Sequence, residues 1–134
     1  MLNLYKDFLY QLISTQASEK SIIWFNQKLA QFKNEPQTKN FYLTFAAIPR
    51  FVEKKSLHIS QDDLQRANDL RKGFQPYWTI DQATRVLWLL HLPTEDESQY
   101  LKILQQILTT ADVNELVALY LALPLLPFAA SHQY

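Results

Sequence analysis

The sequence predicts an all-α protein of about seven helices. Its 134 residues include one glycine, Gly73, so the Asn-Gly and Asp-Gly turns that favour tight β-hairpins are absent. Leucine, glutamine, alanine and lysine, which favour helices, are abundant. Apolar residues also recur at spacings of three and four along most of the chain. The length and the lack of a long polar linker predict a single helical domain over residues 1–134.

The first two helices are predicted from an apolar stripe and a cap. Between residues 2 and 16, apolar residues such as Tyr5 and Leu9 fall on one side of a helix. Ser18 is a candidate N-cap for a second helix, because its hydroxyl can accept a hydrogen bond from the first turn. The segment 34–37, which contains a proline, is expected to end that helix.

A third helix is predicted from about Thr38 to Lys54, with Pro49 inside it. Proline has no N–H, so the carbonyl of Phe45 loses its usual partner in the helix. We therefore expect a kink or a break near Pro49.

The fourth and fifth helices are predicted from their caps. Ser60 begins a polar helix, in which Asp62 and Arg66 are expected to form an i,i+4 pair on the surface. Thr79 and Gln82 have the capping-box spacing, in which each side chain bonds the backbone N–H of the other residue. They predict the start of an apolar helix.

Two further capping boxes predict the last helices. Residues 94–97 are expected to open the sixth helix, and Asp112 with Glu115 to open the seventh. The run 115–128 is almost wholly apolar, but it is shorter than the roughly 20 residues that span a bilayer. We predict a buried helix that stops or kinks at Pro124, and no transmembrane segment.

Short connections between these helices predict antiparallel hairpins. Residues 45–49 and 120–124 share the pattern aromatic-x-Ala-aliphatic-Pro, about 75 residues apart. Such self-similarity is typical of helical-repeat proteins. A short stack resembling HEAT or armadillo repeats and an irregular helical bundle both remain open.

Composition excludes several classes of function. The 13 basic and 13 acidic residues cancel, which argues against nucleic-acid binding and removes one barrier to self-association. Without cysteine there are no thiolate metal sites, and no two histidines have the i,i+4 spacing of a zinc site. Glycine-rich phosphate loops cannot form. We expect no metal, no cofactor and no catalytic residue, and a cytoplasmic location, because no signal peptide is visible.

The candidate binding residues are arginines and aromatic residues around the fifth helix. Arg85 lies among large apolar residues, either as a surface pair with Asp81 or pointing into a groove beside Trp78 and Trp88. In the groove it would bind an anion or a carboxylate. The candidate groove is completed by three further residues, Arg50, Tyr77 and Asp81.

Three positions each allow two interpretations. Arg50 follows the proline of the third helix and is read in the same two ways as Arg85. Tyr77 and Trp78 either fill the core or form a recognition surface. His91, in the last turn of the fifth helix, interacts favourably with the helix C-terminus or acts as a catalytic base.

Three stretches together resemble the EboA family of metabolite-traffic proteins. They are FYLTFAAIPRF at 41–51, WTIDQATRVL at 78–87, and TADVNELVALY at 110–120 running on to LPLLP at 123–127. Family members generally continue into a further segment with an Arg-Thr-Asn-like motif. This chain stops at Tyr134, so the resemblance implies a shortened member or a fragment of a longer domain.

The resemblance implies a role in moving a secondary-metabolite precursor from the cytoplasm towards the periplasm of a bacterium. Family members are encoded beside prenyltransferase-, hydrolase- and sugar-phosphate-type enzymes. We therefore expect a non-enzymatic helical adaptor that binds a protein of the same gene cluster or a small hydrophobic metabolite. The alternatives are an enzyme acting on an aromatic or isoprenoid metabolite, with Arg85, Asp81 or His91 in its site, and an oligomerisation module.

Overall fold

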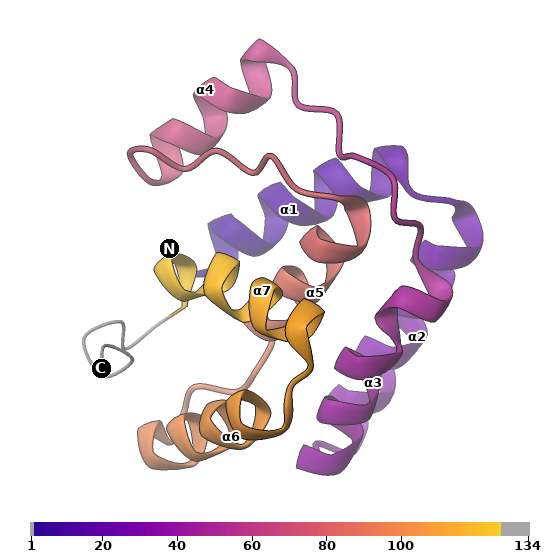
Figure 1. Cartoon of the computed structure of the whole chain (residues 1–134), viewed down its shortest axis with the longest axis vertical. Helices are drawn as coiled ribbons and strands as arrows, with labels where there is room; N and C mark the ends of the chain where they lie inside the picture. The colour runs from indigo at the N-terminus through magenta and orange to yellow at the C-terminus, as the bar shows by residue number, and fades with distance from the viewer. Residues whose placement is uncertain (1, 127–134) are drawn as a thin grey trace.

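The structure, a computed structural model, describes residues 2–126 and confirms the all-α class. No strand is found in this range; Ser56 and Thr79 form an isolated backbone bridge. A 3₁₀ turn, η1 (Leu123–Leu125), follows the last helix. The α-helices, shown in Figure 1, are α1 (Leu2–Gln16), α2 (Glu19–Asn34), α3 (Thr38–Phe51), α4 (Gln61–Leu70), α5 (Ile80–Leu90), α6 (Glu97–Thr110) and α7 (Val113–Ala122).

Helix α5 is the centre of the fold. Every one of its residues except Gln82 is buried, and it packs against α1, α3 and α7 (Figure 1). Burial of its apolar residues favours this position, and its polar side chains Asp81, Thr84 and Arg85 each have a hydrogen-bond partner inside the protein. None of its three partners is its neighbour in the chain. The repeat stack stays a prediction, because this packing neither requires nor excludes it.

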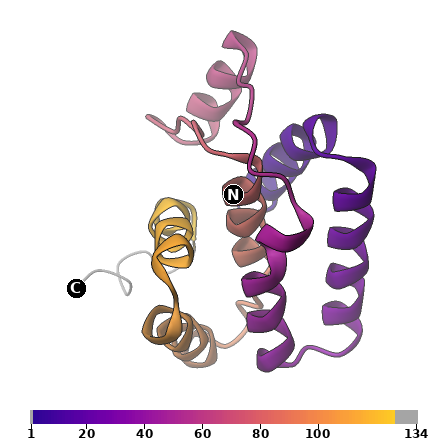
Figure 2. The ribbon, with the colours of Figure 1, turned by 45° about the vertical axis from the view of Figure 1, so that its right-hand side comes forward.

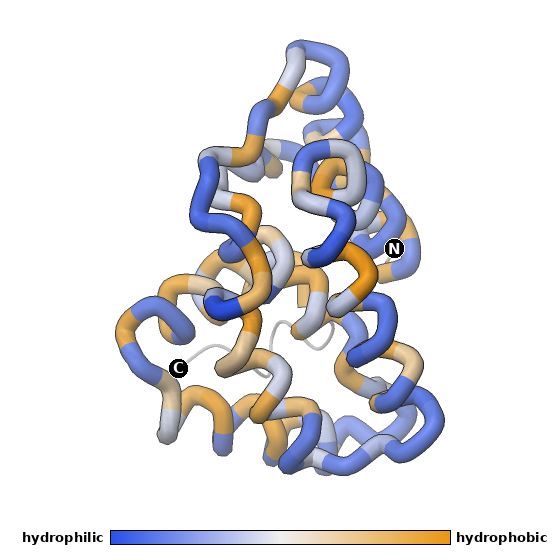
Figure 3. Tube along the Cα trace, turned by 90° about the vertical axis from the view of Figure 1, so that its right-hand side faces the viewer, coloured by the Kyte–Doolittle hydropathy of each residue, from blue (hydrophilic) through white to orange (hydrophobic). Residues whose placement is uncertain are grey.

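Helices α1 to α4 and α6 carry apolar and polar residues on different sides. Figure 3 shows hydrophobic and hydrophilic residues alternating along the helical turns. Helices α2 and α3 lie side by side and run in opposite directions, joined by the short segment 35–37 (Figure 2). This pair forms one of the predicted antiparallel hairpins.

Most predicted helix starts are confirmed by their caps. Ser18 accepts a hydrogen bond from Ser21, and Ser60, Thr79 and Asp112 each form a complete capping box. The predicted box at residues 94–97 is wrong. Asp96 is the N-cap of α6, because its carboxylate accepts the backbone N–H of Gln99 at 3.2 Å.

Helix α3 does not break at Pro49, but it ends earlier than predicted. It continues for two residues beyond the proline and stops at Phe51 rather than near Lys54. Val52 takes an extended conformation and is buried in the core. Glu53 then turns back to accept hydrogen bonds from Ser18, at the start of α2. Tertiary contacts thus end the helix where its local pattern would have continued it.

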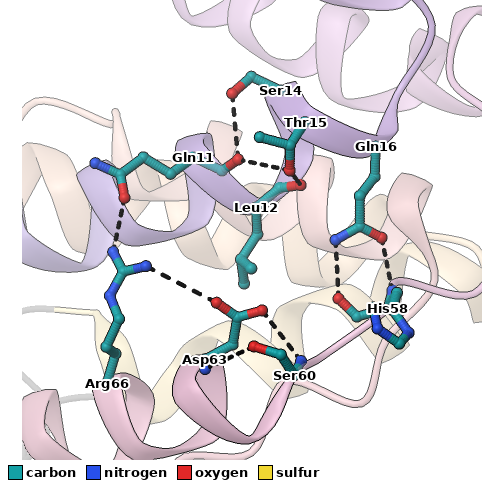
Figure 4. A network of polar contacts seen from close by, with 9 residues as sticks. All are labelled: Gln11, Leu12, Ser14, Thr15, Gln16, His58, Ser60, Asp63 and Arg66. Carbon is teal, nitrogen blue, oxygen red and sulfur yellow. Dashed lines mark hydrogen bonds and ion pairs between the residues drawn. The ribbon is translucent and has the colours of Figure 1, made fainter.

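Helix α4 lies beside α1 and buries only its Ala67, and polar contacts join α1 both to α4 and to the loop before it. Figure 4 shows Gln16 exchanging two hydrogen bonds with the backbone of His58, at 2.8 and 2.7 Å. In the same view Arg66 donates to the Gln11 side chain at 2.6 Å. Arg66 also pairs with Asp63 at 3.8 Å, so the predicted pair with Asp62 is wrong.

The apolar run near the end of the described chain forms a helix with two different sides. Ala118, Leu119 and Ala122 are buried against the core, whereas Val117 and Tyr120 are exposed. The helix was expected to be buried, and only one of its sides is. It ends at Ala122, just before the proline-containing 3₁₀ turn, as predicted. Phe128 lies outside the described residues. Among residues 2–126, no helix combines the length and the apolar character that a membrane crossing requires.

Candidate functional site

The six predicted site residues do not share one surface. Asp81, Arg85 and Trp88 lie together on α5, all three buried in the core. Trp78, in the loop before that helix, is also buried. The two remaining residues are exposed: Tyr77 in the same loop, with 64% of its surface accessible, and Arg50 on α3.

Arg85 makes its contacts inside the protein. It is only 3% exposed, and its Nε donates to the Phe45 carbonyl at 3.3 Å. This is the carbonyl that Pro49 leaves without a helical donor. The guanidinium also lies 5.4 Å from the centre of the Phe45 ring, which adds a cation–π contact. Arg85 therefore joins α5 to α3 at the carbonyl that the proline leaves without a partner. It forms no ion pair with Asp81, whose carboxylate accepts a hydrogen bond from Thr79.

The two buried tryptophans are core residues. Trp88 stacks on Phe41, with ring centres 5.1 Å apart, and its indole N–H donates to the Phe41 carbonyl at 3.0 Å. Trp78 packs on Phe74 at 5.8 Å, and Phe74 packs in turn on Phe8 at 5.9 Å. The indole of a buried tryptophan needs a hydrogen-bond acceptor, and the backbone of α3 supplies it for Trp88.

Arg50 is the predicted residue that lines a groove. The groove lies between α2 and α3 and has a volume of about 400 Å³. Its most distinctive feature is a pair of stacked rings, Trp24 from α2 and Phe51 from α3, with centres 4.7 Å apart and planes 11° from parallel. Phe51 is 49% exposed, so an aromatic surface is open to solvent. The groove is lined by Trp24, Lys28, Gln31, Phe32, Asn40, Leu43, Thr44, Ala47, Arg50 and Phe51.

Polar contacts at one end of the hairpin hold the stacked rings in place. The Ser21 hydroxyl lies 2.7 Å from the Phe51 carbonyl and 2.6 Å from a carboxylate oxygen of Glu53. Glu53 also accepts the backbone N–H of Ser18 at 3.1 Å. The hydrogen bond from Ser21 lowers the pKa of Glu53 below its ordinary value, and those from the backbone add to the effect. An ionised Glu53 therefore joins the start of α2 to the end of α3, beside Phe51.

The charge of the groove is positive. Lys28 and Arg50 lie on its two walls, and no acidic side chain is among the described residues that line it. Gln31 and Asn40 add amide groups that can donate or accept hydrogen bonds. Stacked rings beside uncompensated cations suit a ligand with a flat apolar body and an anionic group.

Sequence reasoning found Arg50 but missed the residues around it. Trp24, Lys28 and Gln31 follow one another at spacings of four and three, which places them on one face of α2. Leu43, Ala47 and Arg50 repeat that spacing on α3. Two exposed faces of this kind on consecutive helices could have predicted the groove.

His91 ends α5 and is partly buried. Burial, together with the smaller effect of the nearby charges of Lys6 and Lys33, lowers its pKa from 6.5 to about 4. At neutral pH the imidazole is therefore uncharged, so the predicted charge interaction with the helix terminus is wrong for that pH. A base with a pKa near 4 is also poorly matched to proton transfer at neutral pH.

No cluster of three or more histidine, aspartate or glutamate side chains with metal-binding geometry occurs among residues 2–126.

The described residues define an all-α protein with a buried central helix and surface grooves. The model of one family, described as metabolite traffic protein EboA, matches residues 5–134. The chain therefore belongs to the EboA family. Neither a curated protein nor a solved structure matched the chain.

Proposed function

We propose that this EboA-family chain is a non-enzymatic accessory protein that binds a small metabolite with a flat apolar body and an anionic group. The site is the α2/α3 groove. The observation that carries the proposal is the stack of Trp24 on Phe51, with Lys28 and Arg50 on the adjoining walls. The family description, metabolite traffic, supports it. A traffic protein has to bind and release a compound without altering it, and these groups can do so.

The contacts expected of the ligand follow from the side chains. A flat ring can extend the existing stack, and such ring contacts contribute about 0.5–1.5 kcal/mol beyond the burial of area. The planar guanidinium of Arg50 can bind a carboxylate or a phosphate through two parallel hydrogen bonds, and Lys28 adds a point charge. The volume of about 400 Å³ lies within the usual range for small-molecule sites.

Titration with anilinonaphthalene sulfonate, a flat apolar anion whose fluorescence rises on binding, tests the site. Replacing both Lys28 and Arg50 with methionine should weaken binding by about tenfold or more, equivalent to about 1.4 kcal/mol. Trp24→Ala should weaken it as well. Lys72→Met, at an exposed position away from the groove, is the control and should bind as the wild type does. Equal affinity for all four proteins would reject the groove, provided that their circular dichroism spectra agree.

We further propose that the protein transfers the metabolite to proteins of the same gene cluster. The family's role in traffic motivates it, because a carrier needs a protein that supplies or receives its cargo. Pull-down of the purified neighbouring gene products with the full chain tests this step. Retention of none of them would remove the adaptor role and leave ligand binding as a separate question.

The enzyme alternative has less support. Arg85 and Asp81 are buried and already bonded within the protein, so a substrate cannot reach them in this conformation. His91 is a weak base at neutral pH, for the reason given above. A substrate-dependent turnover that is lost in His91→Gln but retained without Lys28 and Arg50 would favour the enzyme over the carrier.

Self-association is the second candidate, because α7 exposes Val113, Val117 and Tyr120 on one side. Residues 116–126 carry no charge and the whole chain is neutral, so two copies meeting on this face would not repel each other strongly. Light scattering over a dilution series tests it. A mass that rises with concentration, and that Tyr120→Lys returns to a monomer, supports self-association; a constant monomer mass rejects it.

A further inference from the structure

A second basic cavity lies on another side of α2. It has a volume of about 440 Å³ and is lined by residues of α1, α2 and the segment after α5. Lys6, Lys33 and His91, which are far apart in the sequence, all line it. It shares only Phe32 with the residues that line the α2/α3 groove, so the two sites can be tested independently.

The three basic groups are close enough to oppose one another's charge. Burial lowers the pKa of Lys6, and the charge of Lys33 lowers it further, against an opposite effect of Asp7. The same two lysines add to the burial that lowers the pKa of His91. Like charges brought together without a partner destabilise the fold, and a bound anion would relieve that repulsion.

The protein's own carboxylates do not neutralise the cluster. Glu95 lines the cavity and Asp7 lies near Lys6, but neither forms an ion pair with either lysine in the described structure. Apolar side chains, among them Leu29 and Leu90, form the rest of the wall. The lining of the cavity therefore carries two lysines against one carboxylate, that of Glu95, beside an apolar wall.

We propose that this cavity binds the phosphate group of a small phosphorylated metabolite, with Lys6 and Lys33 as charge partners and His91 as a hydrogen-bond donor. Phosphate fits better than a single carboxylate, because a dianion can balance two lysines at once. Lysine also meets phosphate as a compact charge and does not require the paired geometry that arginine gives a carboxylate. The apolar wall would contact the organic part of the ester. This site does not depend on the proposed function of the α2/α3 groove.

Bound phosphate should change the protonation of His91. A nearby dianion favours the imidazolium, so the pKa of His91 should rise from about 4 towards its ordinary value. The facing charges that set this value are Lys6 and Asp7 on α1, Lys33 on α2, and Glu95 in the loop after α5.

Phenyl phosphate and inorganic phosphate are the probes, and the His91 ring signals in an NMR titration are the readout. We expect saturable shifts with phenyl phosphate, a His91 pKa raised by about one unit or more, and weaker binding of inorganic phosphate, which lacks the apolar part. Lys6→Met with Lys33→Met should weaken binding by about tenfold. Lys72→Met, at an exposed position outside both cavities, is the control and should bind as the wild type does.

Two further variants keep the test decisive if the double lysine variant folds poorly. Glu95→Gln removes the opposing charge in the cavity and should tighten phenyl phosphate binding. Lys6→Met alone should raise the melting temperature of the free protein, because it relieves repulsion. An unchanged His91 pKa at saturating probe, or equal binding by the lysine variants and the wild type, would overturn the proposal. If only the NMR signals of Trp24 shifted, the phosphate would be assigned to the α2/α3 groove. That result would also overturn the proposal.

Discussion

At the scale of single residues, Arg85 supplies a hydrogen bond that Pro49 removes from α3. Proline removes one N–H from α3 and leaves the Phe45 carbonyl without a donor, in a place where Phe45 is completely buried. The Nε of Arg85 supplies the hydrogen bond from α5. A buried arginine without an ion-pair partner in the described structure thus has a structural role, which its position in the sequence alone did not show.

This pairing predicts a coupled effect on stability. Arg85→Met leaves a buried carbonyl unsatisfied and should lower the free energy of unfolding by about 1–3 kcal/mol. Pro49→Ala restores an N–H within the helix, so it should recover part of that loss in the Arg85→Met background. Urea unfolding of the wild type, both single variants and the double variant measures the coupling. If the two effects simply add, Arg85 does not compensate for the proline.

His91 predicts how stability depends on pH. In the unfolded chain its imidazole gains a proton near pH 6.5, whereas in the folded protein it does so near 4. Between these values the unfolded state binds more protons, so stability falls as the pH decreases through this window. Melting temperatures measured at steps across the window should fall less steeply for His91→Gln than for the wild type. Parallel curves for the two proteins would contradict this assignment.

The predicted site residues show what a pattern can and cannot locate. Asp81 and Arg85 have the spacing of a surface pair, but their helix is buried on almost all sides and has no exposed face to place them on. Trp78 and Tyr77 are adjacent in the sequence, yet one is buried and the other exposed. Composition can identify such residues as candidates. Whether each of these side chains points into the core or towards solvent depends on how α5 packs against α1, α3 and α7. No local sequence pattern predicts that packing.

At the scale of elements, the helix starts were predictable because each depends on neighbouring residues. Ser60, Thr79 and Asp112 bond the backbone three residues further on, within a single turn. The start of α6 was misplaced because Thr94 and Asp96 are both suitable caps, and only the structure distinguishes them. The end of α3 was missed because Val52 is fixed by burial.

The cap assignments predict that replacing Thr79 destabilises the protein more than replacing Thr94 does. Thr79→Ala removes a side chain that accepts the backbone N–H of Gln82, so it should lower the free energy of unfolding by about 1 kcal/mol. Thr94→Ala removes a threonine that does not cap α6 and should change it by less than about 0.5 kcal/mol. Chemical denaturation of the two variants beside the wild type measures the difference. Equal losses would show that the cap of α6 is misassigned.

At the scale of the whole molecule, α5 forms the core and α2 carries the candidate sites. Helix α5 is buried against α1, α3 and α7 and leaves little surface for a ligand (Figure 1). Helix α2 lies beside α3 and has a basic surface on each of two sides, one containing Lys28 and the other Lys33. The all-α class was predictable from glycine scarcity and helical spacing. The grooves were not, because each combines side chains from different helices.

The central claim is that the α2/α3 groove binds a flat apolar anion, and Trp24 offers the most direct test of it. The chain has three tryptophans, of which Trp78 and Trp88 are buried in the core. An NMR titration of the ¹⁵N-labelled protein with anilinonaphthalene sulfonate follows the three indole N–H signals separately. The account predicts a saturable shift of the Trp24 signal that disappears when Lys28 and Arg50 are both methionine. An unmoved Trp24 signal at saturating probe, with shifts elsewhere in the protein, would contradict it.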